Sequence, residues 1–211
     1  MWAIKGGTRV GGVRWAAIVL AGGRGSRLGG IDKPALVIGG MTLLDRAVAA
    51  VEGADPVVVV GPRRPTARPV VWTREVEPGS GPVAALAAGL SAVDTAGTVP
   101  ALDDTAPDVP ARDIPAPDVV VLLAADLPAV DCATVRRVRD AVGETGAVLV
   151  DTEGRDQWLL SAWRVDVLRA AVERSGRGLY AVLGPLAPVR VPDPGGASSD
   201  LDTPADLDRW R

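Results

Sequence analysis

Four stretches of the chain are continuously apolar and only a few residues long. They cover residues 16–22, 56–62, 118–126 and 146–151. Short apolar runs of this kind, rich in β-branched residues, are typical of strands that are covered on both faces of a sheet. Residues 69–76 predict a weaker, mixed strand, and residues 156–164 a further one.

Segments with apolar residues at helical spacing lie between these strands. They cover residues 42–54, 81–93 and 131–144. Asp131 stands where it can cap the third of these helices. Two more helices are expected at residues 165–175 and 201–210, the second with Pro204 in its first turn. The alternation predicts an α/β fold of three layers, α/β/α, with helices on both faces of a mostly parallel sheet.

Two parts of the chain fall outside this alternation. Residues 1–15 form an extension ahead of the first strand, which leaves residues 16–211 as one folded domain. Residues 94–118 are rich in Pro, Asp, Ala and Thr and show no periodicity. Such a composition buries too little apolar area to order itself. We interpret residues 94–118 as a flexible surface insertion whose acidic side chains are solvated.

Composition narrows the classes of protein. The chain has 211 residues, 47% of them hydrophobic, which suits a single globular domain with a substantial core. A net charge of -3 without a basic tract favours binding to neither nucleic acid nor a membrane. The single cysteine, Cys132, excludes an internal disulfide bond and predicts a reducing compartment, the cytoplasm. The chain has no histidine, so its chemistry depends on other side chains, backbone amides or a bound cation.

A glycine-rich segment, LAGGRGSRLGGIDKP, follows the first predicted strand at residues 20–34. Open α/β sheets bind ligands at the carboxyl ends of their strands, which is where this segment begins. Its glycines let backbone N–H groups approach a bulky anion, and Arg24, Arg27 and Lys33 add positive charge. Lys33 is one of only two lysines in the chain, which indicates a need for a compact ammonium group. The segment therefore predicts a nucleoside triphosphate site.

Two other glycine-rich nucleotide motifs fit this segment less well. A Walker A loop has Ser or Thr after its lysine, but Pro34 follows Lys33. A dinucleotide-binding fingerprint has its third glycine where this chain has Leu28.

The segment strongly resembles the signature loop of the molybdenum cofactor guanylyltransferases, within the glycosyltransferase-A-like nucleotidyltransferases. The family pattern is LAGG, three residues, Arg, an apolar residue, Gly and then Asp-Lys. The resemblance covers the chain from about residue 16 onward and implies the Rossmann-like fold of nucleotide-diphospho-sugar transferases. It implies nucleotide binding by Leu20, Ala21, Gly22, Gly23, Gly25, Arg27 and Lys33.

A second motif, GSGPVAALAAGL at residues 79–90, is similar to the family's GPLAG segment, which begins a helix beside the nucleotide base. A Gly-Pro start exposes the first amides of a helix and lets a flat ring approach. The resemblance thus implies that Gly81 and Pro82 bind the nucleotide, although Val83 and Ala85 replace the usual Leu and Gly. Glu75, just before this segment, is a further residue that could accept hydrogen bonds from a guanine edge.

Two aspartates are implied in metal binding. Asp126 ends the most apolar strand, at the place of a family Asp-x-Pro motif whose Asp binds Mg²⁺; its alternative role is that of a turn residue. SSDLDTPADL at residues 198–207 resembles a late family motif, which implies that Asp200 or Asp202 supplies a second carboxylate to the same metal. Asp202 is the residue we expect to bind, and its alternative role is to cap a helix.

The resemblance also implies a binding pocket for the acceptor substrate. Family members carry part of this pocket where this chain has RDQWLLSAW, at residues 155–163. Gln157 and Asp200 are the residues expected there. Trp158 and Trp163 either line the pocket or belong to the core. Cys132 has no basic partner nearby in the sequence, so we interpret it as structural.

The resemblance implies transfer of GMP from GTP to the terminal phosphate of (molybdo)pterin, with Arg27, Lys33 and Asp126 as the catalytic residues and Mg²⁺ as cofactor. The implied partners are GTP, molybdopterin or Mo-molybdopterin, and molybdenum-insertion proteins or molybdoenzyme chaperones. Three alternatives stay open: a cytidylyltransferase, a phospholactate guanylyltransferase, and a catalytically inactive nucleotide-binding module.

Overall fold

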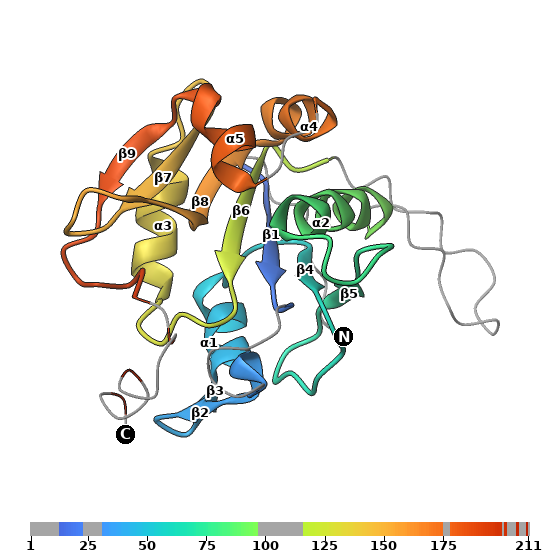
Figure 1. Ribbon diagram of the computed structural model, residues 1–211, viewed down its shortest axis with the longest axis vertical. Coiled ribbons are helices and arrows are strands. Elements are labelled where there is room, and N and C mark those ends of the chain that lie inside the picture. The colour runs from blue at the N-terminus through green and yellow to red at the C-terminus, as the bar shows by residue number, and fades with distance from the viewer. Residues whose placement is uncertain are drawn as a thin grey trace, which may run out of the picture.

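The computed structural model describes residues 13–22, 31–96, 116–174 and 178–199, together with Leu201, Asp206 and Trp210. Within these residues, a central sheet has the strand order β5-β4-β1-β6-β8-β7-β9, and β2 and β3 form a separate hairpin (Figure 1). The strands are β1 (Trp15–Leu20), β2 (Val37–Ile38), β3 (Met41–Thr42), β4 (Val57–Val60), β5 (Val71–Thr73), β6 (Val119–Ala124), β7 (Gly146–Val150), β8 (Asp156–Arg164) and β9 (Val189–Pro192).

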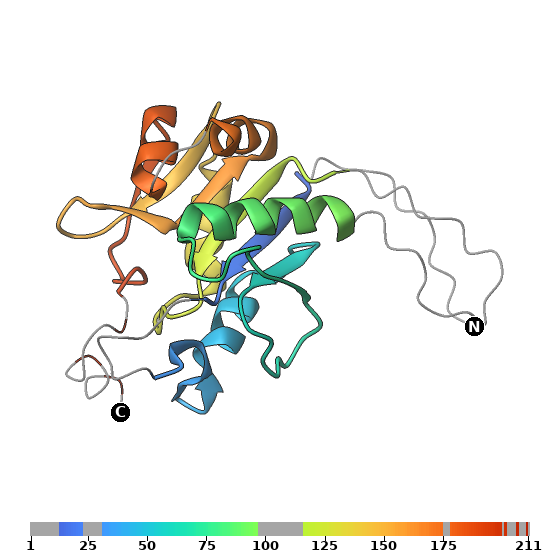
Figure 2. The same cartoon turned by 45° about the vertical axis from the view of Figure 1, so that its right-hand side comes forward.

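Helices cover both faces of this sheet, as the sequence predicted. They are α1 (Leu43–Ala50), α2 (Pro82–Ala96), α3 (Cys132–Asp140), α4 (Val165–Glu173) and α5 (Leu179–Leu183). The helices α1 and α3 pack on one face, while α2, α4 and α5 pack on the other (Figures 1 and 2). The three-layer α/β/α architecture is therefore confirmed.

The burial of β1 explains its continuous apolar sequence. Ala17 and Val19 belong to the core on the side of α1 and α3, whereas Ala16 and Ile18 belong to the core on the side of α2. Because successive side chains point to opposite faces of a sheet, a strand covered on both faces needs apolar residues at every position.

The sheet is mostly parallel, with one exception. Strands β5, β4, β1 and β6 pair in parallel, and β7 pairs in parallel with β9. Strand β8 runs antiparallel to both of its neighbours, β6 and β7. This reversal brings the start of β8 to the edge of the sheet where β6 and β7 end.

Local signals in the sequence set several boundaries. The Asp131 carboxylate accepts a hydrogen bond from the Thr134 amide at 2.8 Å, so Asp131 caps α3 as predicted. Strands β2, β3 and β9 and helix α5 were not predicted from the sequence, because their short lengths give little periodicity. The helix predicted at residues 201–210 lies mostly outside the described residues.

The structure corrects the interpretation of residues 94–118. Helix α2 continues to Ala96, and the Asp94 carboxylate forms an ion pair with Arg169 of α4, so Asp94 is not a solvated bystander. Asp118 accepts a hydrogen bond from the Arg14 amide at 3.2 Å, next to the start of β1. Residues 97–115 lie outside the described residues. In the described part of the chain, no helix is both long and apolar enough to cross a membrane.

Candidate functional site

The carboxyl ends of β5, β4, β1 and β6 lie together at one edge of the sheet. Leu20 of β1 is in register with Val60 of β4 and with Ala124 of β6. The ladder continues beyond the strands, because the Ala21 amide donates to the Val60 carbonyl at 2.8 Å and the Ala125 amide donates to the Leu20 carbonyl at 3.0 Å. The segments that follow these strands therefore begin side by side, as ligand binding at a sheet edge requires.

The backbone at this edge is packed too closely for a side chain at Gly61. A Cβ atom there would lie 2.8 Å from the carbonyl carbon and oxygen of Ala21, and Gly61 has a φ of +146°. Gly61 thus lets the segment after β4 lie directly against the start of the glycine-rich segment. Close by, Glu75 Oε1 lies 3.8 Å from the position of a Cβ atom on Gly22. The structure brings the predicted residues Gly22 and Glu75 together.

Lys33 and Asp126 meet at the same edge. Lys33 begins a 3₁₀-helix (Lys33–Ala35) at the end of the glycine-rich segment, and Asp126 lies just beyond β6. The Lys33 Nζ lies 3.6 Å from Asp126 Oδ2, and the two side chains are 14% and 29% exposed. The site therefore holds a largely covered ammonium group against a carboxylate that solvent and ligand can still reach.

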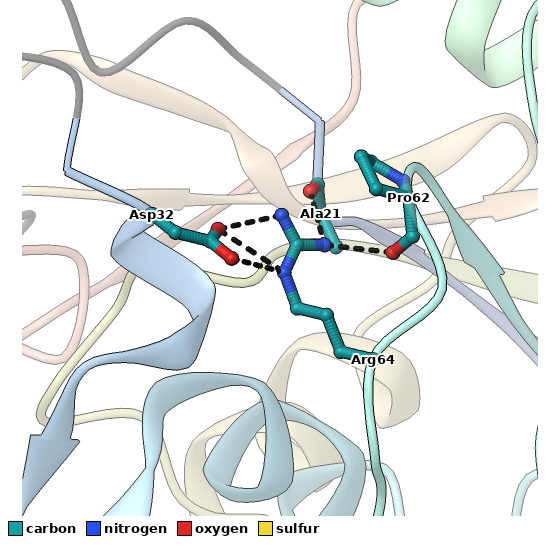
Figure 3. A network of polar contacts seen from close by, with 4 residues as sticks. All are labelled: Ala21, Asp32, Pro62 and Arg64. Carbon is teal, nitrogen blue, oxygen red and sulfur yellow. Dashed lines mark hydrogen bonds and ion pairs between the residues drawn. The ribbon is translucent and has the colours of Figure 1, made fainter.

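Arg64, which the sequence did not single out, connects the segments that follow β1 and β4 at this edge. Its Nε donates to both carboxylate oxygens of Asp32, and its Nη2 donates to one of them at 2.6 Å. Its Nη1 donates to the carbonyls of Ala21 at 3.0 Å and Pro62 at 2.9 Å (Figure 3). The only sequence signal was its place shortly after the buried strand β4, at the carboxyl edge of the sheet.

Gly81 and Pro82 begin α2, as the sequence predicted. Gly81 has a φ of +100°, and its carbonyl accepts the hydrogen bond of the Ala85 amide at 3.1 Å. A Cβ atom at Gly81 would meet no heavy atom of the described residues within 4 Å. The position therefore needs glycine for its backbone conformation, and it leaves space in front of the helix start.

Gln157 lies near the start of β8, at the edge where β7 ends. Its side-chain amide donates to Asp151 Oδ2 at 2.7 Å. The backbone amide of Arg155, together with the Glu153 amide and the Gln157 side chain, holds the pKa of Asp151 below its usual value. An ionised Asp151 fixes the direction of the Gln157 amide group.

Trp163 belongs to the core. It is fully buried, and its Nε1 donates to Ser161 Oγ at 2.8 Å. Trp158 is partly buried and stacks on Trp163 at 6.5 Å between ring centroids.

The contact of Cys132 agrees with a structural role. Its Sγ donates to the Ala49 carbonyl and so links α3 to α1.

Five predicted site residues fall outside the described residues: Gly23, Gly25, Arg27, Asp200 and Asp202. Within the described ranges, no cluster of three or more carboxylate or cysteine side chains could hold a metal ion. Of the two aspartates predicted to bind metal, Asp126 lies in the described part of the chain, just beyond the carboxyl end of β6.

A family model described as the MobA-like NTP transferase domain matches residues 17–189, which is most of the chain. The chain belongs to the MobA-like NTP transferase family. It is therefore a nucleotidyltransferase, as the family resemblance of the glycine-rich segment implied, and the matched range contains both Lys33 and Asp126.

Sequence and fold comparisons agree with this membership. The chain is 29% identical over 207 residues to a molybdenum cofactor guanylyltransferase from Acidiphilium cryptum (strain JF-5), covering 91% of each protein. It also resembles the structure of molybdopterin-guanine dinucleotide biosynthesis protein A from Archaeoglobus fulgidus, with a TM-score of 0.62, 17% identity, and coverage of 92% of this chain and 96% of that one.

A third similar structure is 2-C-methyl-D-erythritol 4-phosphate cytidylyltransferase from Thermus thermophilus. Its TM-score is 0.62, its identity 20%, and the match covers 92% of this chain and 95% of that one. At these identities the two structures show that MobA-like and cytidylyltransferase proteins share the fold of this chain. The fold itself therefore leaves the choice of base to the side chains of the site.

Proposed function

We propose that this chain transfers GMP from GTP to the terminal phosphate of molybdopterin or Mo-molybdopterin. An oxygen of the acceptor phosphate attacks the α-phosphorus of GTP, the bond between the α- and β-phosphates breaks, and pyrophosphate leaves. The observation that carries the proposal is the Lys33–Asp126 pair in a MobA-like NTP transferase. The pair lies at the carboxyl edge of the sheet, called the nucleotide edge below because we propose that GTP binds there. The guanylyltransferase name of the Acidiphilium cryptum relative supports the same reaction.

The reaction needs no covalent nucleophile on the protein, because the attacking phosphate is already anionic. Catalysis then depends on position and on neutralisation of charge. Lys33 would donate to phosphate oxygens, and Arg27 with the amides of Gly22, Gly23 and Gly25 would bind the rest of the triphosphate. The absence of histidine is compatible with this chemistry.

Asp126 fits a magnesium ion by the chemistry of its donor atoms. Mg²⁺ binds through one or two carboxylates together with phosphate oxygens and water, so a partly exposed carboxylate beside a triphosphate suffices. Asp126, and Asp202 as the second carboxylate, would hold it. When bound, Mg²⁺ supplies neutralisation of phosphate charge.

The base and acceptor sides are proposed from neighbouring residues. Gly81 and Pro82 leave room for a flat ring at the start of α2, and Glu75 lies beside Gly22, where its carboxylate could accept hydrogen bonds from guanine. Gln157, fixed by Asp151, and Asp200 would contact the acceptor. We place the reaction in the cytoplasm, with molybdenum-insertion proteins or molybdoenzyme chaperones as receivers of the product.

The test is pyrophosphate release from each of the four nucleoside triphosphates, with molybdopterin as acceptor and with or without Mg²⁺. We expect pyrophosphate release to be fastest with GTP and to require both the acceptor and Mg²⁺. A preference for CTP would assign the chain to the cytidylyltransferases. Release with phospholactate in place of molybdopterin would assign it to that acceptor, and tight GTP binding without release would identify an inactive module. The variant Glu75→Gln should weaken the preference for GTP over ATP.

A further inference from the structure

Arg64 lies on the segment after β4 and reaches two other parts of the chain, the end of β1 and the residue before Lys33. It contacts the Ala21 carbonyl after β1, the Pro62 carbonyl after β4, and the Asp32 carboxylate just before Lys33 (Figure 3). Its side chain is only 14% exposed, although it carries a full charge. We infer that Arg64 is a positioning residue that fixes Asp32, and through Asp32 the Lys33 ammonium group, relative to the end of β1.

The hydrogen bonds favour this role over direct binding of phosphate. A guanidinium group has five N–H donors in one plane. In Arg64, Nε and Nη2 are engaged with the Asp32 carboxylate and Nη1 with two backbone carbonyls. Few donors are left for a ligand. The paired carboxylate also cancels most of the charge that a phosphate would meet.

The backbone carries the constraint from Asp32 to Lys33. The Asp32 carbonyl accepts a hydrogen bond from the Ala35 amide at 3.0 Å, and the Lys33 carbonyl accepts one from the Leu36 amide at 3.0 Å. These bonds close the 3₁₀-turn that Lys33 begins. Because Arg64 holds the residue at the start of this turn, it sets the point from which the Lys33 side chain reaches Asp126.

Arg64 joins two positions near the ends of the glycine-rich segment at residues 20–34. Ala21 lies near the start of this segment and Asp32 near its end. A lysine at position 64 would keep the charge but would have one nitrogen in place of the planar fork, so it could not serve the carboxylate and both carbonyls together. The inference therefore predicts that Arg64→Lys fails almost as fully as Arg64→Ala.

The first test reads the position of Lys33 without any enzyme assay. The chain has only two lysines, so acetylation of Lys33 by an amine-specific reagent can be followed by peptide mass spectrometry. We expect Arg64→Ala and Arg64→Lys to raise the acetylation rate of Lys33 at least about fivefold over the unmodified chain. The matched control, Arg63→Ala, removes an exposed arginine next to Arg64 and should leave the rate unchanged.

The second test rests on the proposed function. Arg64→Ala should lower kcat/KM for GTP about tenfold to a hundredfold, the scale of a displaced catalytic group. In a Lys33→Ala background the same substitution should change kcat/KM less than about twofold, because its effect passes through Lys33. A direct phosphate ligand would keep its full effect in that background.

The outcomes separate the inference from the proposed function. If the unmodified chain releases no pyrophosphate, the proposed function fails, and the acetylation rates still decide the role of Arg64. If acetylation of Lys33 is unchanged in Arg64→Ala, the inference is overturned whatever the activity. Should Arg64→Ala not fold, as judged by thermal unfolding, Asp32→Asn replaces it and must give the same increase.

Discussion

The Lys33 ammonium group lies 3.6 Å from the Asp126 carboxylate, although the two residues belong to distant parts of the sequence. One follows the segment after β1, and the other follows β6, the strand hydrogen-bonded to β1. The parallel pairing of these strands puts a cation suited to phosphate beside a carboxylate suited to Mg²⁺. This juxtaposition supports nucleotidyl transfer, and the following predictions test it together with the packing around it.

Removal of the Lys33 ammonium group should abolish transfer without unfolding the protein. We expect Lys33→Ala to lower kcat/KM for GTP about a hundredfold to a thousandfold, the effect of losing one group that stabilises transition-state charge. A partly exposed ion pair contributes at most about 1 kcal/mol, so the Tm should move by only a few degrees. The control is Lys5→Ala, the other lysine of the chain, and full activity in Lys33→Ala would refute the mechanism.

Loss of the Asp126 carboxylate should weaken the binding of Mg²⁺ that pyrophosphate release requires. In the unmodified chain, chelation with EDTA should stop pyrophosphate release, and added Mg²⁺ should restore it. Asp126→Asn should lose about a hundredfold in rate and should need a higher Mg²⁺ concentration for half-maximal release. Asp140→Asn, an exposed carboxylate at the end of α3, is the matched control. An unchanged Mg²⁺ dependence in Asp126→Asn would exclude it as a metal ligand.

A methyl group at Gly61 should damage both the fold and the site. The methyl carbon would lie 2.8 Å from the Ala21 carbonyl, and the φ of +146° at position 61 is rare for residues with a side chain. We expect Gly61→Ala to lower the free energy of unfolding by about 1–3 kcal/mol, because overpacking and backbone strain add. Denaturant unfolding measures this, with Gly195→Ala as control, since that position has open space around it. Equal stability of the two variants would contradict the close approach at Gly61.

The buried carboxylate of Asp193 should make stability depend on pH. Burial raises the pKa of Asp193, but hydrogen bonds from the Ser198 amide and hydroxyl, with the amides of Ala197 and Gly195, lower it to below its usual value overall. A lowered pKa in the folded state adds stability above the unfolded pKa of about 4, and this contribution is lost as pH falls through the folded value.

Asp193→Ala should therefore cost about 1–3 kcal/mol at pH 7, the range for a hydrogen-bonded charged group. The difference from the unsubstituted chain should shrink as pH falls below about 4, the unfolded pKa, and through the lower pKa of Asp193 in the folded state. Denaturant unfolding at pH 7 and pH 3 measures the change, and Asp140→Ala serves as the exposed control. A difference that stays constant between these pH values would show that the ionised form of Asp193 adds no stability.

Sequence patterns were sufficient where local chemistry dictates structure. The apolar runs predicted β1, β4, β6 and β7 because a strand covered on both faces needs apolar residues throughout. Asp131 and the Gly81-Pro82 pair predicted two helix starts, since capping and a positive φ depend on the residues themselves. Lys33 and Asp126, which the structure brings within 3.6 Å of each other, could be singled out because each follows the carboxyl end of a predicted strand.

Contacts between distant segments could not be predicted in this way. Asp94 lies in a segment with the composition of a solvated loop, yet α4 brings Arg169 to it. Arg64 is one arginine among several after β4, and only the parallel packing of β4 against β1 puts its guanidinium group within reach of Ala21 and Asp32.

The sequence by itself determined the layers of this protein and most strands of its sheet, because periodicity and local conformation depend on neighbouring residues. Only the tertiary structure decided the antiparallel direction of β8, the contact of Lys33 with Asp126, and the contacts of Arg64 with Ala21 and Asp32. The reason is physical: these features arise from strand pairing between remote segments, and no local propensity specifies which remote groups will meet.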